Sequence, residues 1–180
     1  MKRAILVPPS LGGALDELKH WLAITNTQDD ASLEALLRAS IETCEAFTGV
    51  MPLSATVEEV HMACHEWQTL SAAPVQAISG THLVADDGNR STLAIGDYEI
   101  DIASDGTGRF RLLTVGALKR VAVQFHAGIA DGWDTLPDGL RHGILRLAAH
   151  HYRNRDAAEE ASPPAAVAAL WRPWRRMRLA

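Results

Sequence analysis

The sequence predicts an α+β fold: a helical bundle with an inserted small antiparallel β subdomain and an extended C-terminal tail. Apolar residues recur with helical spacing in residues 11–49 and 137–155. Between them, residues 55–128 contain short alternating runs separated by Gly- and Asp-rich turns, a pattern typical of antiparallel strands. We therefore expect a single domain in residues 1–155, followed by a linker and docking tail in residues 156–180.

Two helices are expected near the N-terminus. Their apolar stripes consist of Leu15, Leu18 and Leu22 in the first helix, and of Leu33, Leu36, Leu37, Ile41, Cys44 and Phe47 in the second. Asp29 or Asp30 can accept the first free amides of the second helix, which Gly49 and Pro52 end. Since only a short acidic turn joins the two helices, an antiparallel hairpin is predicted.

The middle of the chain carries the strand signals. The apolar runs are Val57, Val60, Leu83-Val84, Leu93–Ile95, Tyr98–Ile102, Phe110–Leu112 and Val121–Phe125. Asp87-Gly88 has the composition of a hairpin centre, because glycine reaches the positive φ angles that tight turns need. These runs predict the small β subdomain.

The third helix begins after Trp133. Pro137 suits a first helical turn, and one face carries Leu140, Ile144, Leu147, Ala148 and Tyr152. Residues 156–166 are Ala, Glu, Ser and Pro, the composition of a linker. Residues 167–170 then allow another short helix, which Pro173 would stop.

The bulk properties indicate an ordinary globular protein with an uneven charge. The 180 residues are 47% hydrophobic and 22% charged, and the formal net charge is −5. Residues 161–180 hold four of the 17 basic residues and none of the 22 acidic ones, which leaves a net charge of −9 on residues 1–160. No secretory signal and no apolar run near the ~20 residues of a membrane span is found, so we expect a protein made in the cytoplasm.

No residue pattern indicates an enzyme, a metal site or a cofactor. His61 and His65 would lie about 13 Å apart on one face of a strand that rises ~3.3 Å per residue, too far to share an ion. The rings of His150 and His151 point apart on a helix, and Cys44 lies on an apolar stripe, where a thiol is unreactive filling. The glycine pairs lack the context of a phosphate-binding loop.

The final segment admits four interpretations. It carries Leu170, Trp171, Arg172, Pro173, Trp174, Arg175, Arg176 and Arg178. Trp and Arg supply the buried anchors of protein interfaces, which favours a protein-docking peptide. The same residues could stack on bases and pair with phosphates, sit at a membrane surface, or fold back so that Trp171 caps the chain's own core while the arginines stay in solvent.

The order of these segments resembles the head–tail connector (adaptor) proteins of long-tailed phages and phage-like gene transfer agents. The resemblance runs from about Leu15 to the C-terminus. Its motifs are LDELK (15–19), the Asp29-Asp30 turn, FTG (47–49), GDYEID (96–101), FHAG (125–128), LPDGLR (136–141), LAAHHYRNR (147–155) and LWRPWR (170–175).

This resemblance implies a structural protein of the virion neck, at the head–tail interface, made in the cytoplasm of a bacterial host. It implies a homo-oligomeric ring, typically of twelve subunits, beneath the portal protein, where the ring extends the DNA channel and meets the next neck or tail-completion protein. It further implies that Leu170, Trp171, Arg172, Pro173, Trp174, Arg175 and Arg176 contact the portal. DNA would pass through the channel without specific binding, and no membrane is involved.

The net charge agrees with this expectation, because an acidic body repels the phosphates of sliding DNA. The alternative is a small nucleic-acid-binding protein that grips DNA with its basic aromatic tail. That alternative predicts tight duplex binding with a steep salt dependence, whereas a connector binds DNA weakly.

Overall fold

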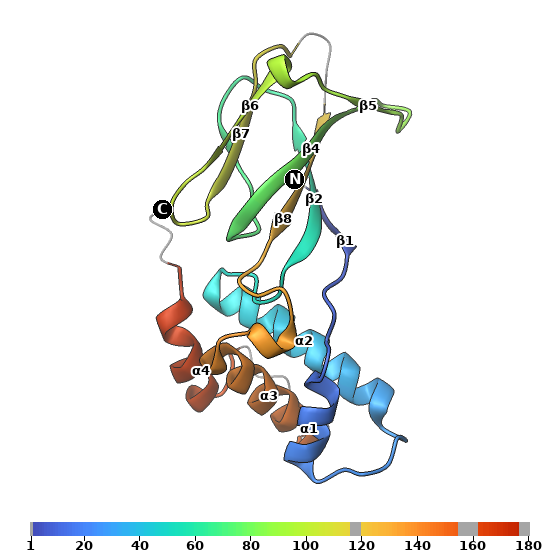
Figure 1. Cartoon of the computed structure of the whole chain (residues 1–180), viewed down its shortest axis with the longest axis vertical. Helices are drawn as coiled ribbons and strands as arrows, with labels where there is room; N and C mark the ends of the chain where they lie inside the picture. Colours follow the sequence, from blue (N-terminus) through green and yellow to red (C-terminus); the bar gives the residue numbers. More distant parts are fainter. Residues whose placement is uncertain (1, 116–119, 155–161, 177–180) are drawn as a thin grey trace. The chain divides into compact units, whose positions relative to one another are not determined.

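The computed structural model describes residues 2–115, 120–154 and 162–176. They form two compact units, each described by itself (Figure 1). The β unit consists of Met1–Pro8 and Ser54–Gly128, and the helical unit of Pro9–Leu53 and Ile129–Ala180. Residues 54–128 are thus inserted between the two parts of the helical unit, whereas the strand within Met1–Pro8 precedes that unit in the sequence.

The larger sheet of the β unit has five strands in the order β1-β2-β8-β4-β5, with every neighbouring pair antiparallel. The strands are β1 (Lys2–Val7), β2 (Ala55–Met62), β8 (Arg120–Ala127), β4 (Val75–Val84) and β5 (Arg90–Thr92). The central strand β8 carries buried Val121, Val123 and Phe125 at alternate positions. This alternation points one face of β8 into the core, as the period of a strand requires.

The smaller sheet has the order β3-β7-β6. It is built from β3 (Gln68–Thr69), β7 (Gly108–Leu112) and β6 (Tyr98–Ile102), and the short 3₁₀ helix η1 (Ile95–Asp97) precedes β6. Phe110 and Leu112 of β7 are buried, while Arg109 and Arg111, at the alternate positions, point outward. The ring of Phe110 meets the ring of His61 of β2 edge-on at 5.1 Å, which brings the two sheets into contact.

The helical unit packs four helices around one apolar core. They are α1 (Ala14–Leu22), α2 (Asp30–Thr48), α3 (Asp138–Arg153) and α4 (Ala165–Trp171), with the 3₁₀ helices η2 (Trp133–Thr135) and η3 (Arg172–Trp174). The core is filled by leucines of α1, α2 and α3 together with Trp133 and Trp171. Gly49 ends α2 at φ 72°, a left-handed conformation that glycine adopts without strain.

Two long-range hydrogen bonds hold the ends of these helices. The indole Nε1 of Trp133 donates to Glu17 Oε2 at 2.8 Å, and the hydroxyl of Tyr152 donates to Asp29 Oδ2 at 2.7 Å. In both pairs an aromatic side chain buries its ring and satisfies its polar atom at a neighbouring helix.

The structure confirms the mixed α+β class and the position of strands β2 to β8 between α2 and α3, whereas β1 precedes the helices. The hairpin centre at Asp87-Gly88 is also confirmed, since Gly88 has φ 86° and the Ala85 amide donates to the Asn89 carbonyl at 2.9 Å.

Two expectations about local structure were wrong. The run at Leu93–Ile95 forms no strand: β5 ends at Thr92, and Ile95 begins η1. The extended form of the tail is wrong for the described residues of that segment, because α4 and η3 are helical and pack on the helical unit. The short helix allowed by residues 167–170 is present and longer than expected, because Pro164 lies just before its first turn.

Besides β5, which the predicted run at Leu93–Ile95 missed, two strands were not foreseen. β1 contains a single continuous apolar run with no alternation, and β3 is only two residues long. Neither length nor period marks such segments in a sequence; their pairing with β2 and β7 makes them strands.

Candidate assembly interface

The C-terminal segment, residues 165–176, is the candidate interface. Its helix α4 starts after Pro164, whose carbonyl accepts the amides of Val167 and Ala168 at 2.8 and 2.9 Å. The buried side chains of α4 are Val167 and Trp171, four residues apart and hence on the same helical face. The segment is therefore a short amphipathic helix that seals the core of the helical unit.

Trp171 lies inside that core and is fully buried. Its indole Nε1 donates to the Leu140 carbonyl at 3.4 Å, and its ring lies 6.0 Å from the ring of Phe47 on α2. A Cβ atom at Gly143 of α3 would come within 2.1 Å of that Nε1. The indole thus fits against α3 only because residue 143 has no side chain.

The end of the segment is fixed to the C-terminus of α2. The Arg176 amide donates to the Thr48 carbonyl at 2.8 Å, one of the carbonyls that the last turn of a helix leaves free. The Arg175 guanidinium lies 5.5 Å from the centre of the Phe47 ring, within the range of a cation–π contact. Positive charge at this position also suits the partial negative charge of a helix C-terminus.

The segment presents a basic surface outward. Arg172, Pro173 and Arg175 are exposed, and Trp174 and Arg176 are partly exposed. Since the side chain of Trp171 points into the core while these residues face solvent, the described surface combines cations with one part-buried aromatic ring. Arginine and aromatic side chains are enriched in protein–protein interfaces.

The structure therefore separates the seven residues expected to contact a portal. Trp171 is a core residue of its own chain in this structure, as one of the four interpretations of the segment held, and Leu170 is part-buried beside it. The other five, Arg172, Pro173, Trp174, Arg175 and Arg176, are exposed or partly exposed. Arg178 and most of the expected linker lie outside the described residues.

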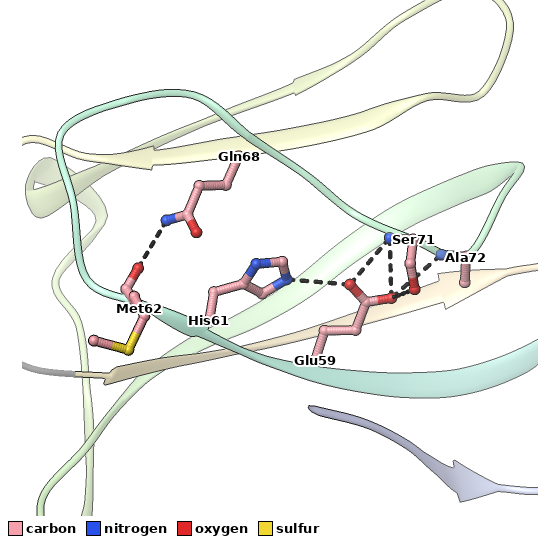
Figure 2. A network of polar contacts seen from close by, with 6 residues as sticks. All are labelled: Glu59, His61, Met62, Gln68, Ser71 and Ala72. Carbon is pink, nitrogen blue, oxygen red and sulfur yellow. Dashed lines mark hydrogen bonds and ion pairs between the residues drawn. The ribbon is translucent and has the colours of Figure 1, made fainter. Parts of the chain in front are cut away.

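A buried polar network in the β unit was missed by sequence reasoning (Figure 2). The carboxylate of Glu59 on β2 is fully buried and accepts hydrogen bonds from the Ser71 hydroxyl at 2.5 Å and from the amides of Ser71 and Ala72 at 3.0 to 3.2 Å. Nε2 of His61 lies 3.1 Å from its other side. The alternation of a strand could have indicated this network, because Val57, Glu59 and His61 lie on the same face of β2.

The network changes the acidity of Glu59. Burial by itself would raise the pKa of this carboxyl, but the hydrogen bonds from His61, Ser71 and Ala72 outweigh burial and lower the pKa below its ordinary value. The neighbouring Glu58 points to the opposite face of the strand, where its hydrogen bonds with Arg90 lower its pKa as well. Both carboxylates are thus held charged and fixed in place by donors, a structural arrangement.

The expectation that His61 and His65 share one face of a strand was wrong, because β2 ends at Met62. His65 lies beyond the end of β2, with its Nδ1 3.1 Å from the Leu112 carbonyl oxygen, while His61 meets Glu59. Burial raises the pKa of the Cys44 thiol to about 12, which leaves it protonated and unreactive. Within the described residues, no group of three or more His, Cys, Asp and Glu side chains could hold a metal ion.

Three solved structures are similar to this chain over its length. The neck of an empty gene transfer agent particle, computed with C6 symmetry, superposes with a TM-score of 0.77 at 25% identity and covers 100% of this chain and 98% of the other. The virion of a native gene transfer agent particle gives a TM-score of 0.73 at 27% identity, with 100% and 98% covered. The neck of a native particle, computed with C12 symmetry, gives 0.73 at 26% identity, with 98% and 97% covered.

The resemblance to the neck proteins of gene transfer agents is confirmed. It extends through both the β unit and the helical unit, because nearly all of each chain is covered. The expected location, the neck of a phage-like particle, is the location that two of these structures describe. No family model and no curated protein matches the sequence.

Across the described residues, no helix has the length and apolar composition needed to cross a bilayer.

Proposed function

We propose that this chain is a head–tail connector, which forms a ring under the portal of a phage-like particle, extends the DNA channel and joins head to tail. The observation that carries the proposal is the end-to-end likeness to gene transfer agent neck structures at 25 to 27% identity. The role is structural, and the polar networks described above are consistent with it because their side chains are fixed in hydrogen bonds.

The symmetry of the similar structures supports the number of copies that we propose. Necks computed with C12 and C6 symmetry are both built from cyclic arrangements, and twelve copies satisfy both. A cyclic ring of identical chains with more than two members needs head-to-tail contacts, in which two different patches of the subunit meet. We therefore propose a twelve-membered ring with two distinct contact surfaces on each copy.

The C-terminal segment is the proposed contact with the portal. Arg172, Pro173, Trp174, Arg175 and Arg176 would touch the partner, and the buried Trp171, with Leu170 beside it, would hold the segment in place. Because the segment is already helical and packed, its ordering is part of folding. Binding then costs less conformational entropy than docking of a free tail would.

The acidic charge is the second part of the proposal. With a net charge of −9 on residues 1–160, a ring of such subunits repels the phosphates of DNA on average. DNA can then move through the channel without the phosphate contacts that retard it.

Charge reversal on the outer face of the C-terminal segment tests the portal contact. In the double variant Arg172→Glu and Arg175→Glu, both side chains are exposed, so Trp171 keeps its buried packing and only the contact of Arg175 with the Phe47 ring is lost. We expect binding to the portal protein encoded with this chain to weaken at least about tenfold, since reversing charges in a contact is costly. Binding is measured by biolayer interferometry with the full-length chain.

The matched control is the double variant Arg146→Glu and Arg153→Glu, which makes the same change in net charge at exposed positions of α3. Undiminished portal binding by R172E/R175E would exclude the segment as the contact, and absence of binding by the unmodified chain would overturn the connector role. Deleting the segment is a poorer test, because it removes the core residue Trp171 together with the surface.

A further inference from the structure

The β unit has two open sheet edges that carry uncovered apolar side chains. β1 is the first strand in the order β1-β2-β8-β4-β5, and β6 is the last in the order β3-β7-β6. Ile5 and Val7 on β1 are 47% and 59% exposed, and Ile100 and Ile102 on β6 are 46% and 39% exposed. Apolar edge strands of this kind are templates for pairing with another chain.

The exposed isoleucines belong to the core-facing sides of their sheets. Ile5 lies opposite Val57 on β2, and Ile100 lies opposite Phe110 on β7, and both partners are fully buried. Directly opposed residues of an antiparallel pair point to the same face. The core of the β unit is therefore left open at β1 and at β6, where another strand would complete it.

The two edges lie on opposite sides of the β unit. β3 neighbours the end of β2, because the Gln68 side chain donates to the Met62 carbonyl at 2.9 Å. The turn between β6 and β7 neighbours the start of β4, where the Val75 amide donates to the Gly106 carbonyl at 2.8 Å. β1 thus lies beyond β2 on one side, and β6 on the side of β4, with β8 between them (Figure 1).

The charges of the edges are complementary. β1 carries Lys2 and Arg3 and no acidic residue, whereas residues 95–102 carry Asp97, Glu99 and Asp101 and no basic one. Glu99 and Asp101 pair with Arg111 and Arg109 of β7, yet their side chains remain 45% and 42% exposed. Opposite charges at the two edges favour contact between β1 and β6 over contact of either edge with itself.

We propose that β1 of one copy adds to β6 of the next copy by strand pairing, so that the β units form a head-to-tail ring. The strands have matching lengths of six and five residues. Each copy then offers one edge and receives the other, the two different patches that a closed ring needs. This inference rests on the proposed connector function, because the occupant of each edge is a second copy of this chain.

Lysines placed on the core-facing side of β6 test the contact. In the double variant Ile100→Lys and Ile102→Lys, the half-exposed positions tolerate the charge in the single subunit but place it inside the proposed contact. We expect the fraction of ring-assembled protein to fall about tenfold, because charge buried without a partner opposes association. The control Ile95→Lys changes the 87% exposed residue of η1, outside the strand, and is expected to form rings normally.

Ring assembly is measured by sedimentation velocity and electron microscopy of the full chain mixed with its portal protein. Rings formed equally well by the double variant would overturn strand pairing and leave the connector function standing. If the unmodified chain forms no ring and does not bind the portal, the proposed function fails and the inference fails with it.

Cysteine cross-linking tests the pairing without relying on loss of assembly. One variant carries Leu6→Cys on β1, and a second variant carries Glu99→Cys on β6. Both variants also carry Cys64→Ser, which removes the accessible native thiol. Under mild oxidation of mixed rings, we expect a disulfide between a β1-cysteine copy and a β6-cysteine copy. Disulfides only between copies of the same variant would show that like edges meet, and would overturn the head-to-tail arrangement.

Discussion

Gly143 sets the position of the C-terminal segment through a single missing side chain. Any Cβ there would overlap the indole of Trp171, which approaches to 2.1 Å of that point, and would also meet its Cδ1 and Cε2 at 2.8 Å. Glycine is otherwise unfavourable in a helix interior by about 1 kcal/mol relative to alanine. Close packing of Trp171 compensates for this cost.

We therefore predict that Gly143→Ala destabilises the protein by about 1 to 3 kcal/mol, despite the better helix propensity of alanine. The control is Gly139→Ala on the same helix, where a Cβ would meet its nearest atom, the Leu170 carbonyl oxygen, at 3.4 Å. This variant is expected to be neutral or slightly stabilising. Urea unfolding followed by circular dichroism compares the two, and equal stability of both variants would contradict the prediction.

Glu59 makes the stability of the protein depend on pH in the acid range. Its pKa is lowered in the folded state, so its stabilising contribution is fully present above the ordinary Glu value of about 4.3. The contribution is lost as the pH falls from there through the lowered folded value, because the unfolded chain then binds the proton more readily.

We predict that Glu59→Gln lowers the free energy of unfolding at pH 7 by about 2 kcal/mol, since one amide oxygen cannot accept every bond of the carboxylate. The difference from the unmodified protein should shrink below pH ~4.3. Thermal unfolding between pH 3 and 7 measures it. Glu66→Gln, at an exposed position in the same unit, removes the same charge and should have little effect; a pH-independent difference for E59Q would contradict the argument.

At the scale of elements, α4 is a seven-residue helix too short to be stable alone. Its order depends on the burial of Val167 and Trp171 against α3 and α2. The same burial keeps the outer arginines in place. The buried side chain of Trp171 therefore supports both the core of the helical unit and the proposed portal surface.

We predict that Trp171→Ala costs about 3 to 5 kcal/mol of stability and releases the C-terminal segment. Hydrogen exchange should accelerate in residues 165–176 and at the packed faces of α2 and α3, while exchange in the β unit stays unchanged. Phe47→Leu is the control, because it keeps an apolar side chain beside Trp171 and should leave the segment protected. Unchanged exchange in W171A would show that the segment is held by other contacts.

Sequence patterns predicted the helices far better than the edges of the sheets. The stripes of α2 and α3 repeat over several turns, and Leu33, Leu37, Leu140 and Ile144 are indeed buried. β1 has two basic residues followed by an unbroken apolar run, and it is exposed at nearly every position, so neither burial nor period marks it in the sequence. Its assignment needs the partner strand β2, which lies about 50 residues further along the chain.

At the scale of the whole molecule, charge is the property that bears on DNA. The basic C-terminal segment is small against the net charge of −9 on residues 1–160. A protein that grips duplex DNA owes most of its affinity to released counterions, which requires many phosphate contacts.

We predict that the full chain binds duplex DNA no more tightly than a Kd of about 10⁻⁴ M at physiological salt, the weak end of non-specific binding. Fluorescence anisotropy with a labelled duplex over a range of salt concentrations measures this. R172E/R175E should differ little from the unmodified chain. Micromolar binding with a steep salt dependence, abolished in that variant, would favour the alternative of a nucleic-acid-binding protein.

The sequence by itself determined the class of fold, the order of helices and strands, the hairpin at Asp87-Gly88 and the resemblance to neck proteins, because these depend on local period, turn chemistry and segment order. Tertiary structure alone decided that Trp171 faces the core, that Glu59 is buried among donors, and that β1 and β6 leave the sheets open. The physical reason is that burial is a property of the neighbours a side chain meets. Those neighbours lie far away in the sequence, and no local pattern names them.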